Sequence, residues 1–324
     1  MTTLPRISVI IPTYNRAAYL AEAVDSALAQ RGVEVEVIIV DDGSTDDTAD
    51  VVRRCSDRWG QRVAYLTQEN AERSVARNHG LRRATAEYVA FLDSDDVWRE
   101  THAESCIAAL RRCPEAIAAY SEYGLIDADG GRIRERVSRP IPDRDRLLRA
   151  LCLKEVILHP TEVVLRRDRL GGDGLFDPEI PGAEDWLLWI ELAGRAPMVS
   201  TGSATVWMRS HGAGTFGDPV KFARSLLLAA EKVLATGWPA RLGLNQDRIR
   251  AINRAHCAYA FYLNGKTDES WRLLQEAAKV HRPILFSRDF RTVAIRLLAG
   301  PWLSGKIRAF RNRGEKRTAP PPAR

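Results

Sequence analysis

Two clusters of acidic residues are the part of this 324-residue sequence best suited to chemistry, and each follows a short hydrophobic run. The clusters are Asp41-Asp42-Gly43-Ser44, after residues 37–40, and Asp93-Ser94-Asp95-Asp96, after residues 88–92. A run of β-branched and aromatic residues that stops at carboxylates is typical of a buried parallel strand. Because ligands bind at the carboxyl ends of the strands in open α/β sheets, we expect both clusters to lie at a binding site.

Carboxylates grouped in this way repel one another unless a cation neutralises them. Hard oxygen ligands suit Mg²⁺ or Mn²⁺. The two clusters therefore predict a metal-dependent enzyme that acts on a phosphorylated ligand.

The elements around the clusters alternate strand and helix. Up to residue 98 the expected strands are residues 7–11, 35–40, 62–67 and 87–92, and the expected helices are residues 17–30, 44–59 and 71–84. Ser44, with Asp47 three residues later, resembles a capping box at the start of the second helix. This order predicts an α/β fold with a mostly parallel, Rossmann-like central sheet flanked by helices.

After residue 98 the expected strands and helices no longer alternate regularly, and near the C-terminus only helices are expected. The expected elements are helices 101–112, 143–153 and 183–194, strands 117–123, 161–167 and 204–209, and then helices 223–236, 246–264 and 267–280. Residues 313–324 are basic and rich in proline, and we expect them to be disordered.

The composition, with 45% hydrophobic and 28% charged residues, indicates a soluble globular protein. The five cysteines show no CxxC spacing, which argues against a zinc site or a disulfide framework and fits a reducing compartment. The net charge of +6 is uneven, because residues 283–324 carry +8 and the rest carries −2. A basic tail on a near-neutral body argues against a nucleic-acid-binding protein.

The predicted location is cytoplasmic. Residues 1–6 run directly into the first expected strand, so we expect no signal peptide, and no apolar run approaches the roughly 20 residues that span a bilayer. Residues 283–313 combine arginines and lysines with aromatic and aliphatic residues at helical spacing. This segment predicts either peripheral contact with the cytoplasmic face of a membrane or a helix packed on the body and followed by a solvated tail.

Four motifs in order resemble those of the family 2 glycosyltransferases, which have the GT-A fold. They are Val9-Ile10-Ile11-Pro12-Thr13-Tyr14-Asn15-Arg16 with Val40-Asp41-Asp42-Gly43-Ser44, then Gln68-Glu69-Asn70 with Ala76-Arg77-Asn78-His79-Gly80, then Phe91-Leu92-Asp93-Ser94-Asp95-Asp96, and finally Glu184-Asp185-Trp186. The third resembles the family's DXD motif and the fourth its ED motif. The resemblance covers roughly residues 7–211 and leaves out the helical C-terminal third.

On the donor side, the resemblance implies a role for each matching residue. Pro12, Tyr14 and Asn15 correspond to the end of the family's first strand, under the nucleotide. Asp42 corresponds to the carboxylate that accepts a hydrogen bond from the uracil imide. Arg77 corresponds to a basic side chain that faces the diphosphate.

For the metal and the reaction, the resemblance implies a second group of roles. Asp93 and Asp95 bracket the DXD motif, and Asp95 is the expected direct metal ligand. Asp185 corresponds to the general base, with Glu184 as the alternative. His211 resembles a late histidine that some members place beside the metal and the diphosphate.

These roles predict an inverting enzyme that moves one sugar from a nucleotide-diphosphate sugar, with a UDP-sugar favoured, to a hydroxyl of a glycan or lipid-linked acceptor. A divalent cation, Mn²⁺ or Mg²⁺, would stabilise the charge on the leaving diphosphate. A carboxylate would take the proton of the acceptor hydroxyl. A single base opposite the leaving group predicts direct displacement with inversion. His159 is a further candidate for contact with the acceptor.

Two departures from the family pattern bear on this interpretation. The sequence shows neither the QxxRW motif nor the flanking membrane helices of processive members, which favours a single addition. Ala71-Glu72 stands where a glycine usually follows the residue matched by Asn70.

Two alternatives remain beside the transferase. A sugar-phosphate nucleotidylyltransferase would need a GxGxRxxP loop where Pro12-Thr13-Tyr14-Asn15 stands. A non-catalytic sugar- or nucleotide-binding scaffold of the same fold is disfavoured by the intact Asp95 and Asp185.

On the preferred interpretation, residues 1–98 form the nucleotide-sugar-binding half of a GT-A domain and residues 99–218 its acceptor-binding and catalytic half. Residues 219–282 form a helical region, and residues 283–324 form the basic amphipathic segment and tail.

Overall fold

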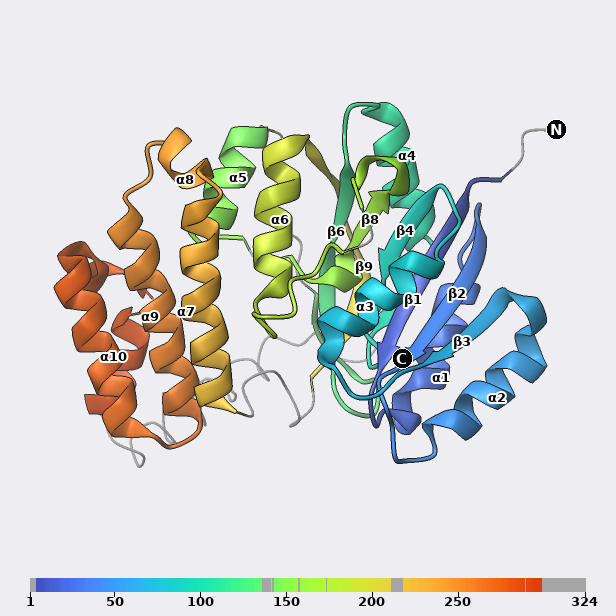
Figure 1. Ribbon diagram of the computed structural model, residues 1–324, viewed down its shortest axis with the longest axis horizontal. Helices are drawn as coiled ribbons and strands as arrows, with labels where there is room; N and C mark the ends of the chain where they lie inside the picture. Colours follow the sequence, from blue (N-terminus) through green and yellow to red (C-terminus); the bar gives the residue numbers. More distant parts are fainter. Residues whose placement is uncertain are drawn as a thin grey trace, which may run out of the picture. The chain divides into compact units, whose positions relative to one another are not determined.

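The computed structural model describes residues 4–135, 141, 143–156, 158–172, 174–210, 218–288 and 290–298. The chain divides into two compact units. Unit 1 consists of Met1–Gly214 and Glu231–Leu244, and unit 2 consists of Thr215–Ala230 and Asn245–Arg324. Unit 1 is an α/β structure, whereas the described part of unit 2 is helical (Figure 1).

Unit 1 is built on a mixed sheet that has nine strands within the described residues. The strands are β1 (Arg6–Thr13), β2 (Glu34–Asp41), β3 (Val63–Thr67), β4 (Tyr88–Phe91), β5 (Val97–Trp98), β6 (Ala118–Ile126), β7 (Arg132–Glu135), β8 (Val163–Arg166) and β9 (Met198–Arg209). They pair in the order β3-β2-β1-β4-β8-β6-β9-β5, and β7 pairs with β6 outside this path. The predicted α/β fold is therefore confirmed.

The strands β1 to β4 form a parallel half of the sheet, as the sequence predicted. Their valine and isoleucine side chains are buried because helices cover both faces. The register pairs Thr13 with Asp41 and Asp41 with Thr67, so β1, β2 and β3 end side by side. The acidic residues that follow these strands are thereby brought to one edge.

The other half of the sheet is mixed. Strand β8 runs antiparallel to both β4 and β6, while β6 is parallel to β9. The short strands β5 and β7 were not predicted, and each pairs antiparallel with a longer neighbour. The strand expected at residues 161–167 is shorter than predicted, because the 3₁₀ turns η2 (Pro160–Glu162) and η3 (Arg167–Arg169) flank β8.

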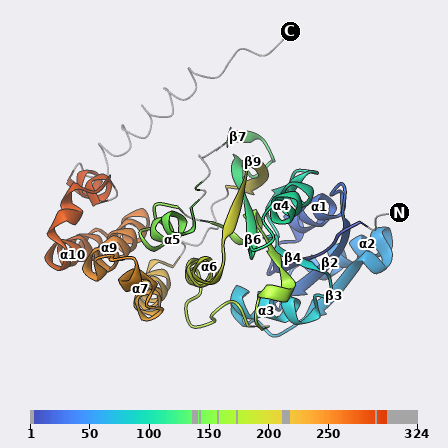
Figure 2. The same cartoon turned by 90° about the horizontal axis from the view of Figure 1, so that it is seen from above.

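Helices cover both faces of this sheet (Figure 2). On one face, α1 (Ala17–Leu28), α2 (Thr48–Trp59) and α4 (His102–Arg112) pack on the main hydrophobic core. The helix α3 (Glu72–Arg83) lies on the opposite face. In the second half of the unit, α5 (Arg144–Cys152) packs against α6 (Glu184–Arg195).

A glycine brings α3 very close to the sheet. A Cβ added at Gly80 would lie 2.4 Å from Cγ2 of Ile10 and 3.1 Å from Cγ2 of Val40. A larger residue would push the helix away from the strands, because real Cβ atoms do not approach so closely. Arg77, one turn earlier, is thereby held near the carboxyl ends of β1 and β2.

The start of α2 differs from the prediction. The helix begins at Thr48, and its N-cap residue Asp47 makes no side-chain capping bond. Asp46 accepts a hydrogen bond from the Thr48 N–H at 3.1 Å instead. The Ser44 hydroxyl accepts one from the Asn15 N–H at 2.9 Å. The predicted capping box was therefore wrong, because Ser44 stabilises the loop after β1 rather than the helix.

Unit 2 contains the predicted helical region. Its described helices are the first part of α7 (Pro219–Ala235), α9 (Gln246–Leu263), α10 (Thr267–Val280), the 3₁₀ helix η4 (Arg282–Phe286) and a last helix that reaches residue 298. The Ser270 hydroxyl donates to the Ala258 carbonyl at 2.7 Å, which joins α10 to α9 in the interior. Residues 299–324, which include the predicted tail, lie outside the described part of the chain.

None of the helices in the described ranges is both long enough and apolar enough to cross a membrane.

Candidate functional site

A cavity of about 290 Å³ opens at the carboxyl ends of β1, β2 and β4 and the N-terminus of α3. Its lining combines acidic, basic and small polar side chains from three of the four sequence motifs: Pro12, Thr13, Tyr14, Arg16, Asp42, Asn70, Glu72, Arg73, Ala76, Arg77, Asp93, Ser94 and Asp95. Two buried polar atoms on this lining, Thr13 Oγ1 and Arg77 Nε, have no hydrogen-bond partner among the described residues. Buried polar groups of this kind normally find a partner, so the cavity is suited to a polar ligand.

Asp42 is a buried carboxylate in this lining. Its Oδ1 atom accepts hydrogen bonds from Gln68 Nε2 at 2.7 Å and from the Ala71 N–H at 2.9 Å. Both donors come from the segment between β3 and α3. They fix the orientation of the carboxylate and place a hydrogen-bond acceptor against the cavity.

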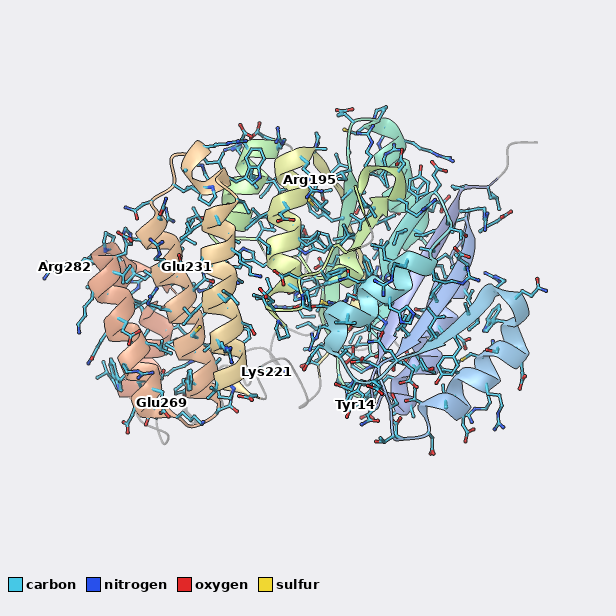
Figure 3. The ribbon with its side chains drawn as sticks, in the orientation of Figure 1. Tyr14, Arg195, Lys221, Glu231, Glu269 and Arg282 are labelled. Carbon is cyan, nitrogen blue, oxygen red and sulfur yellow. The ribbon has the colours of Figure 1, made fainter. Side chains whose placement is uncertain are left out.

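The loop after β1 has a strained backbone that its side chains stabilise. Asn15 has a φ of 51°, and its Oδ1 accepts a hydrogen bond from the Thr45 N–H at 2.8 Å. Together with the bond from the Asn15 N–H to Ser44, this contact ties the loop to the segment after β2. Tyr14, in the same loop, lines the cavity and is 47% exposed. It lies at the surface of unit 1 (Figure 3).

Arg77 is a buried cation that joins two motifs. Its Nη2 lies 2.8 Å from Asp93 Oδ1, and its Nη1 lies 2.8 Å from Glu184 Oε1. Burial lowers the pKa of Arg77, but the charges of Asp93 and Glu184 outweigh that effect and raise it overall. The guanidinium lines the cavity while it bridges the two carboxylates, so it remains charged there.

The turn after β4 presents three carboxyl groups in three different environments. Burial raises the pKa of Asp93, but the charges of Arg77 and Arg73 outweigh this and lower it overall. Asp95 lies at the cavity with 21% of its side chain exposed, 3.5 Å from the Arg16 guanidinium. Burial, followed by the charges of its two acidic neighbours, raises the pKa of Asp96 well above its usual value.

Within the described ranges, no three histidine, cysteine, aspartate or glutamate side chains converge as a ready-made metal cage. Magnesium-type ions usually take one or two carboxylates together with phosphate oxygens of the substrate. Asp95 lines the cavity, and the Arg16 cation beside it shows that this carboxylate accommodates positive charge there. The residues present therefore fit a divalent ion that shares its coordination with a diphosphate.

Asp185 belongs to the first turn of α6 and is partly buried. Burial raises the pKa of Asp185 to about 6, the charge of Glu184 adds to the rise, and the charges of Arg77 and Lys154 oppose it. The Trp186 N–H donates to its Oδ1 at 2.7 Å. A carboxyl with a pKa near neutrality is suited to exchange a proton at physiological pH. Its neighbour Glu184 is instead bound to Arg77, which connects α6 to the cavity lining.

The strained backbone positions gather around these groups. Among the described residues, three non-glycine residues have a positive φ: Asn15 at 51°, Glu72 at 74° and Lys154 at 52°. Glu72 lines the cavity at the point where a family glycine was missing from the sequence. The Lys154 ammonium lies 4.2 Å from the centre of the Trp186 ring, beside Asp185. Such strain persists where the surrounding structure enforces it, and it clusters at functional sites.

Sequence reasoning assigned no role to several residues that shape this site, although Thr13, Arg16 and Glu72 stood in or beside the quoted motifs. The residues without an assigned role are Thr13, Arg16, Glu72, Lys154, Thr161 and Arg209. Local spacing carried no signal for Lys154, Thr161 and Arg209, because their contacts join segments far apart in the chain. The one available signal was Ala71-Glu72 in place of a glycine.

Four predicted residues lie away from the cavity lining or outside the described chain. Asn15 and Asp185 are not part of the lining, although Tyr14 and Arg16, on either side of Asn15, are. His159 caps η2, and its ring meets Tyr123 edge to face at 5.6 Å. His211 lies outside the described residues, so its predicted roles in metal and diphosphate binding stay predictions.

The fold and the site define a class of protein with an α/β domain and a polar cavity at the carboxyl ends of its parallel strands. The sequence profile of Glycosyl transferase family 2 matches residues 8–171. This match covers half of the chain, and the chain belongs to that family.

Curated relatives agree with this membership. TuaG of Bacillus subtilis, which is named as a glycosyltransferase of teichuronic acid biosynthesis, is 35% identical over 192 residues that cover 58% of this chain and 72% of that protein. An uncharacterized glycosyltransferase of Rickettsia conorii is 31% identical over 230 residues, which cover 71% of this chain and 37% of that protein. The chain spans about a third of the length of this and two other Rickettsia relatives.

Solved structures share the fold. Residues 1–349 of TarS from S. aureus, in complex with UDP-GlcNAc, align with a TM-score of 0.62 and 21% identity over 85% of this chain and 81% of that chain. The mannosyltransferase PcManGT from Pyrobaculum calidifontis, in complex with GDP-Man and Mn²⁺, aligns with a TM-score of 0.57 and 21% identity over 92% and 85%. The predicted GT-A fold and family are confirmed.

Proposed function

We propose that this protein is an inverting, metal-dependent glycosyltransferase that moves one sugar from a nucleotide-diphosphate sugar to an acceptor hydroxyl. The observation that carries the proposal is the single cavity lined by Asp42, Arg77, Asp93 and Asp95. Arg77 connects this cavity, through Glu184, to the helix turn that bears Asp185. The edge that we propose for nucleotide binding and the residue that we propose as proton acceptor therefore belong to the same unit.

The donor side follows from the groups that line the cavity. Asp42 accepts the imide N–H of the base, and Pro12, Tyr14 and Asn15 form the floor and rim under the nucleoside. Arg77 offers positive charge to the diphosphate next to Asp93. The bound nucleotide-sugars of structural neighbours, UDP-GlcNAc in TarS and GDP-Man in PcManGT, support a donor of this class. An imide acceptor favours a uracil or thymine nucleotide over a guanine nucleotide.

Asp95, with His211 as the expected second ligand, would hold a divalent ion, Mn²⁺ or Mg²⁺. When bound, such an ion neutralises the negative charge that develops on the leaving diphosphate. The Mn²⁺ in the PcManGT complex supports this cofactor class. Asp93 stays ionised through its bond to Arg77 and so adds to the negative charge beside that ligand.

Asp185 takes the proton of the acceptor hydroxyl as that oxygen attacks the anomeric carbon. Its raised pKa makes it a stronger base than an exposed carboxylate while leaving it largely ionised above about pH 6. One base on the side opposite the leaving group gives direct displacement with inversion. The acceptor class we propose is a glycan or lipid-linked hydroxyl.

Calorimetric titration of UDP, dTDP and GDP into the full chain, with Mn²⁺ and with a chelator, tests this proposal. We expect one nucleotide to bind more tightly with Mn²⁺, and Asp95→Ala to remove that difference. Asp47→Ala, at an exposed position outside the cavity, is the matched control. Failure of all three nucleotides to bind would favour a non-catalytic scaffold.

We also propose that the C-terminal part of unit 2 contacts an anionic membrane surface. Four exposed side chains follow helical spacing along the last helix: Arg288, Arg291, Ile295 and Leu298. Phe286 is 80% exposed beside them, and Arg282 adds charge on the surface of the unit (Figure 3). Exposed apolar side chains mixed with arginines suit the interface of anionic lipids.

Co-sedimentation with vesicles of phosphatidylglycerol and phosphatidylcholine tests the membrane contact. Phe286→Ser together with Leu298→Ser should weaken binding severalfold, whereas Leu4→Ser, an exposed apolar position in unit 1, should not. Unchanged sedimentation of the double variant would contradict this part of the proposal.

A further inference from the structure

Arg209, the last residue of β9, has a side chain that is only 2% exposed and meets acceptors on several segments. Its Nε donates to the Asp95 carbonyl at 2.9 Å, and its Nη2 donates to Glu22 Oε2 at 2.6 Å. Its Nη1 donates to the Ala128 carbonyl at 3.0 Å and to the Asp127 carbonyl at 3.3 Å. One guanidinium thus joins α1, the turn after β4 and the turn after β6.

Burial of a cation costs several kcal/mol unless its donors and charge are matched. Here the ionised partner is Glu22, while three main-chain carbonyls accept the other N–H groups. The Tyr19 ring lies 4.8 Å from the guanidinium carbon and adds a favourable cation–π contact. The number and geometry of these contacts hold the Asp95 main chain at a fixed distance from β9.

The same turn is held from its other end by Asp96. The Arg209 N–H donates to Asp96 Oδ1 at 3.0 Å, and the Thr161 hydroxyl donates to Asp96 Oδ2 at 2.9 Å. The buried side chain of Asp96 and the carbonyl of Asp95 are therefore both used for attachment. Asp95 itself lines the cavity, where its Oδ2 lies 3.5 Å from Nε of Arg16, another lining residue.

We propose that Arg209 is a positioning residue that sets the geometry of the Asp95 carboxylate for the shared binding of a divalent ion and a nucleotide diphosphate. The inference rests on the proposed function, in which Asp95 is the metal ligand. Arg209 is not part of the cavity lining and would act through the main chain of Asp95. The side chain nearest in charge, lysine, cannot replace it, because one ammonium group cannot reach acceptors on three segments at once.

The test compares nucleotide binding by the full chain with Mn²⁺ and with a chelator. The probe is whichever of UDP, dTDP and GDP binds the wild type most tightly. In Arg209→Lys, we expect the affinity gained with Mn²⁺ to fall about tenfold or more, as for other residues that orient a metal ligand. The affinity measured with the chelator should stay within about twofold of the wild type, because the base and ribose contacts are unchanged.

Two further variants separate positioning from general damage. Glu22→Gln removes the charge of one outer partner at a position with 55% of the side chain exposed, so the fold should persist. We expect it to lower the Mn²⁺-dependent gain about threefold, in the same direction as Arg209→Lys. Arg166→Lys is the matched control, because Arg166 also donates to a carbonyl, that of Leu110 at 2.8 Å, at the opposite end of the sheet.

The outcomes distinguish this inference from the proposed function. If Arg209→Lys keeps the full gain in nucleotide affinity with Mn²⁺, the positioning role is overturned. An equal loss of nucleotide affinity with Mn²⁺ and with the chelator also overturns it. If Arg209→Lys does not fold, Glu22→Gln decides: an unchanged gain in nucleotide affinity with Mn²⁺ in that variant overturns the positioning role. A wild type that gains no affinity with Mn²⁺ overturns the proposed metal site and, with it, this inference.

Discussion

We call the cavity lining around Asp42 the nucleotide edge and the first turn of α6 around Asp185 the catalytic edge, after the roles that we propose for them. Both present a carboxyl group, but in two different environments. At the nucleotide edge, Asp42 is fixed by donors from Gln68 and Ala71. At the catalytic edge, Asp185 accepts one bond from the adjacent Trp186 N–H, and burial raises its pKa to about 6. A ligand acceptor has to be rigid and charged, whereas a proton acceptor needs a pKa near the working pH. This difference agrees with the roles that we propose, in which Asp42 binds the nucleotide and Asp185 accepts the proton.

Arg77 connects these two edges, and its removal should have the largest effect. Arg77→Ala would leave Glu184, with 3% of its side chain exposed, as a buried charge without its cation. We expect a loss of about 3–5 kcal/mol in the free energy of unfolding, together with weaker nucleotide binding. Urea titration of the full chain measures the first effect and calorimetry the second.

A double variant sharpens this prediction. Arg77→Met with Glu184→Gln removes both charges, so stability should partly return while nucleotide affinity stays low. A loss below about 1 kcal/mol in Arg77→Ala would show that the ion pairs do not connect the two edges.

The nucleotide edge was largely predictable from the sequence. Hydrophobic runs that stop at Asp41 and Asp93 indicate parallel strands, and the carboxyl ends of such strands meet at one edge. Gly80 could be assigned to a close approach of helix and sheet only once the structure was known. Tyr14, Asp42 and Asp95 line one cavity at this edge, whereas Asn15 does not, and the roles of all four stay predictions.

The contacts that hold the turn after β4 were less predictable, because they join residues far apart in the chain. Arg209 meets Glu22 and Asp95, and Thr161 meets Asp96, at separations that no local pattern encodes. The antiparallel strands β5 and β7 are short, so they leave little periodic signal. The capping box at Ser44 failed for the same reason, since the competing partner was Asn15 in another strand–helix loop.

The pH dependence of turnover should distinguish the two edges. Asp185 acts when it has lost its proton, so turnover should fall about tenfold for each pH unit below about 6, the pKa that burial and Glu184 give it. Nucleotide affinity at saturating Mn²⁺ should follow a different curve. Initial rates and titrations between pH 5 and pH 8 would measure both. If turnover and nucleotide affinity changed in the same way with pH, the separate roles of the two edges would be contradicted.

At the nucleotide edge, Asp42→Asn should weaken the binding of uracil nucleotides about tenfold, because a charged acceptor becomes a neutral one. The asparagine Oδ1 can still accept from Gln68 and Ala71, so stability should change little. Asp41→Asn is the control, since Asp41 bonds Tyr65 and Ser44 instead. Equal effects of both substitutions on affinity would argue against a base-binding role for Asp42.

At the catalytic edge, Lys154→Gly should have the smallest effect of this series. Glycine adopts the φ of 52° without strain, but it loses the contact of the Lys154 ammonium with the Trp186 ring, so the free energy of unfolding should change by less than about 1 kcal/mol. The loss of a cation beside Asp185 should move the acid limb of the pH–rate profile to higher pH. Arg241→Ala, which removes a cation 4.7 Å from the Trp238 ring, is the control and should leave the limb in place.

The most direct test of the central claim is Asp185→Asn, with nucleotide affinity and donor turnover measured on the same preparation. We predict that turnover falls at least about 100-fold while nucleotide affinity stays within about twofold of the wild type. Because the raised pKa shows that the ionised form of Asp185 is disfavoured in the folded state, the variant should also be somewhat more stable above pH 6. Full turnover in Asp185→Asn, or equal losses of binding and turnover, would contradict the account.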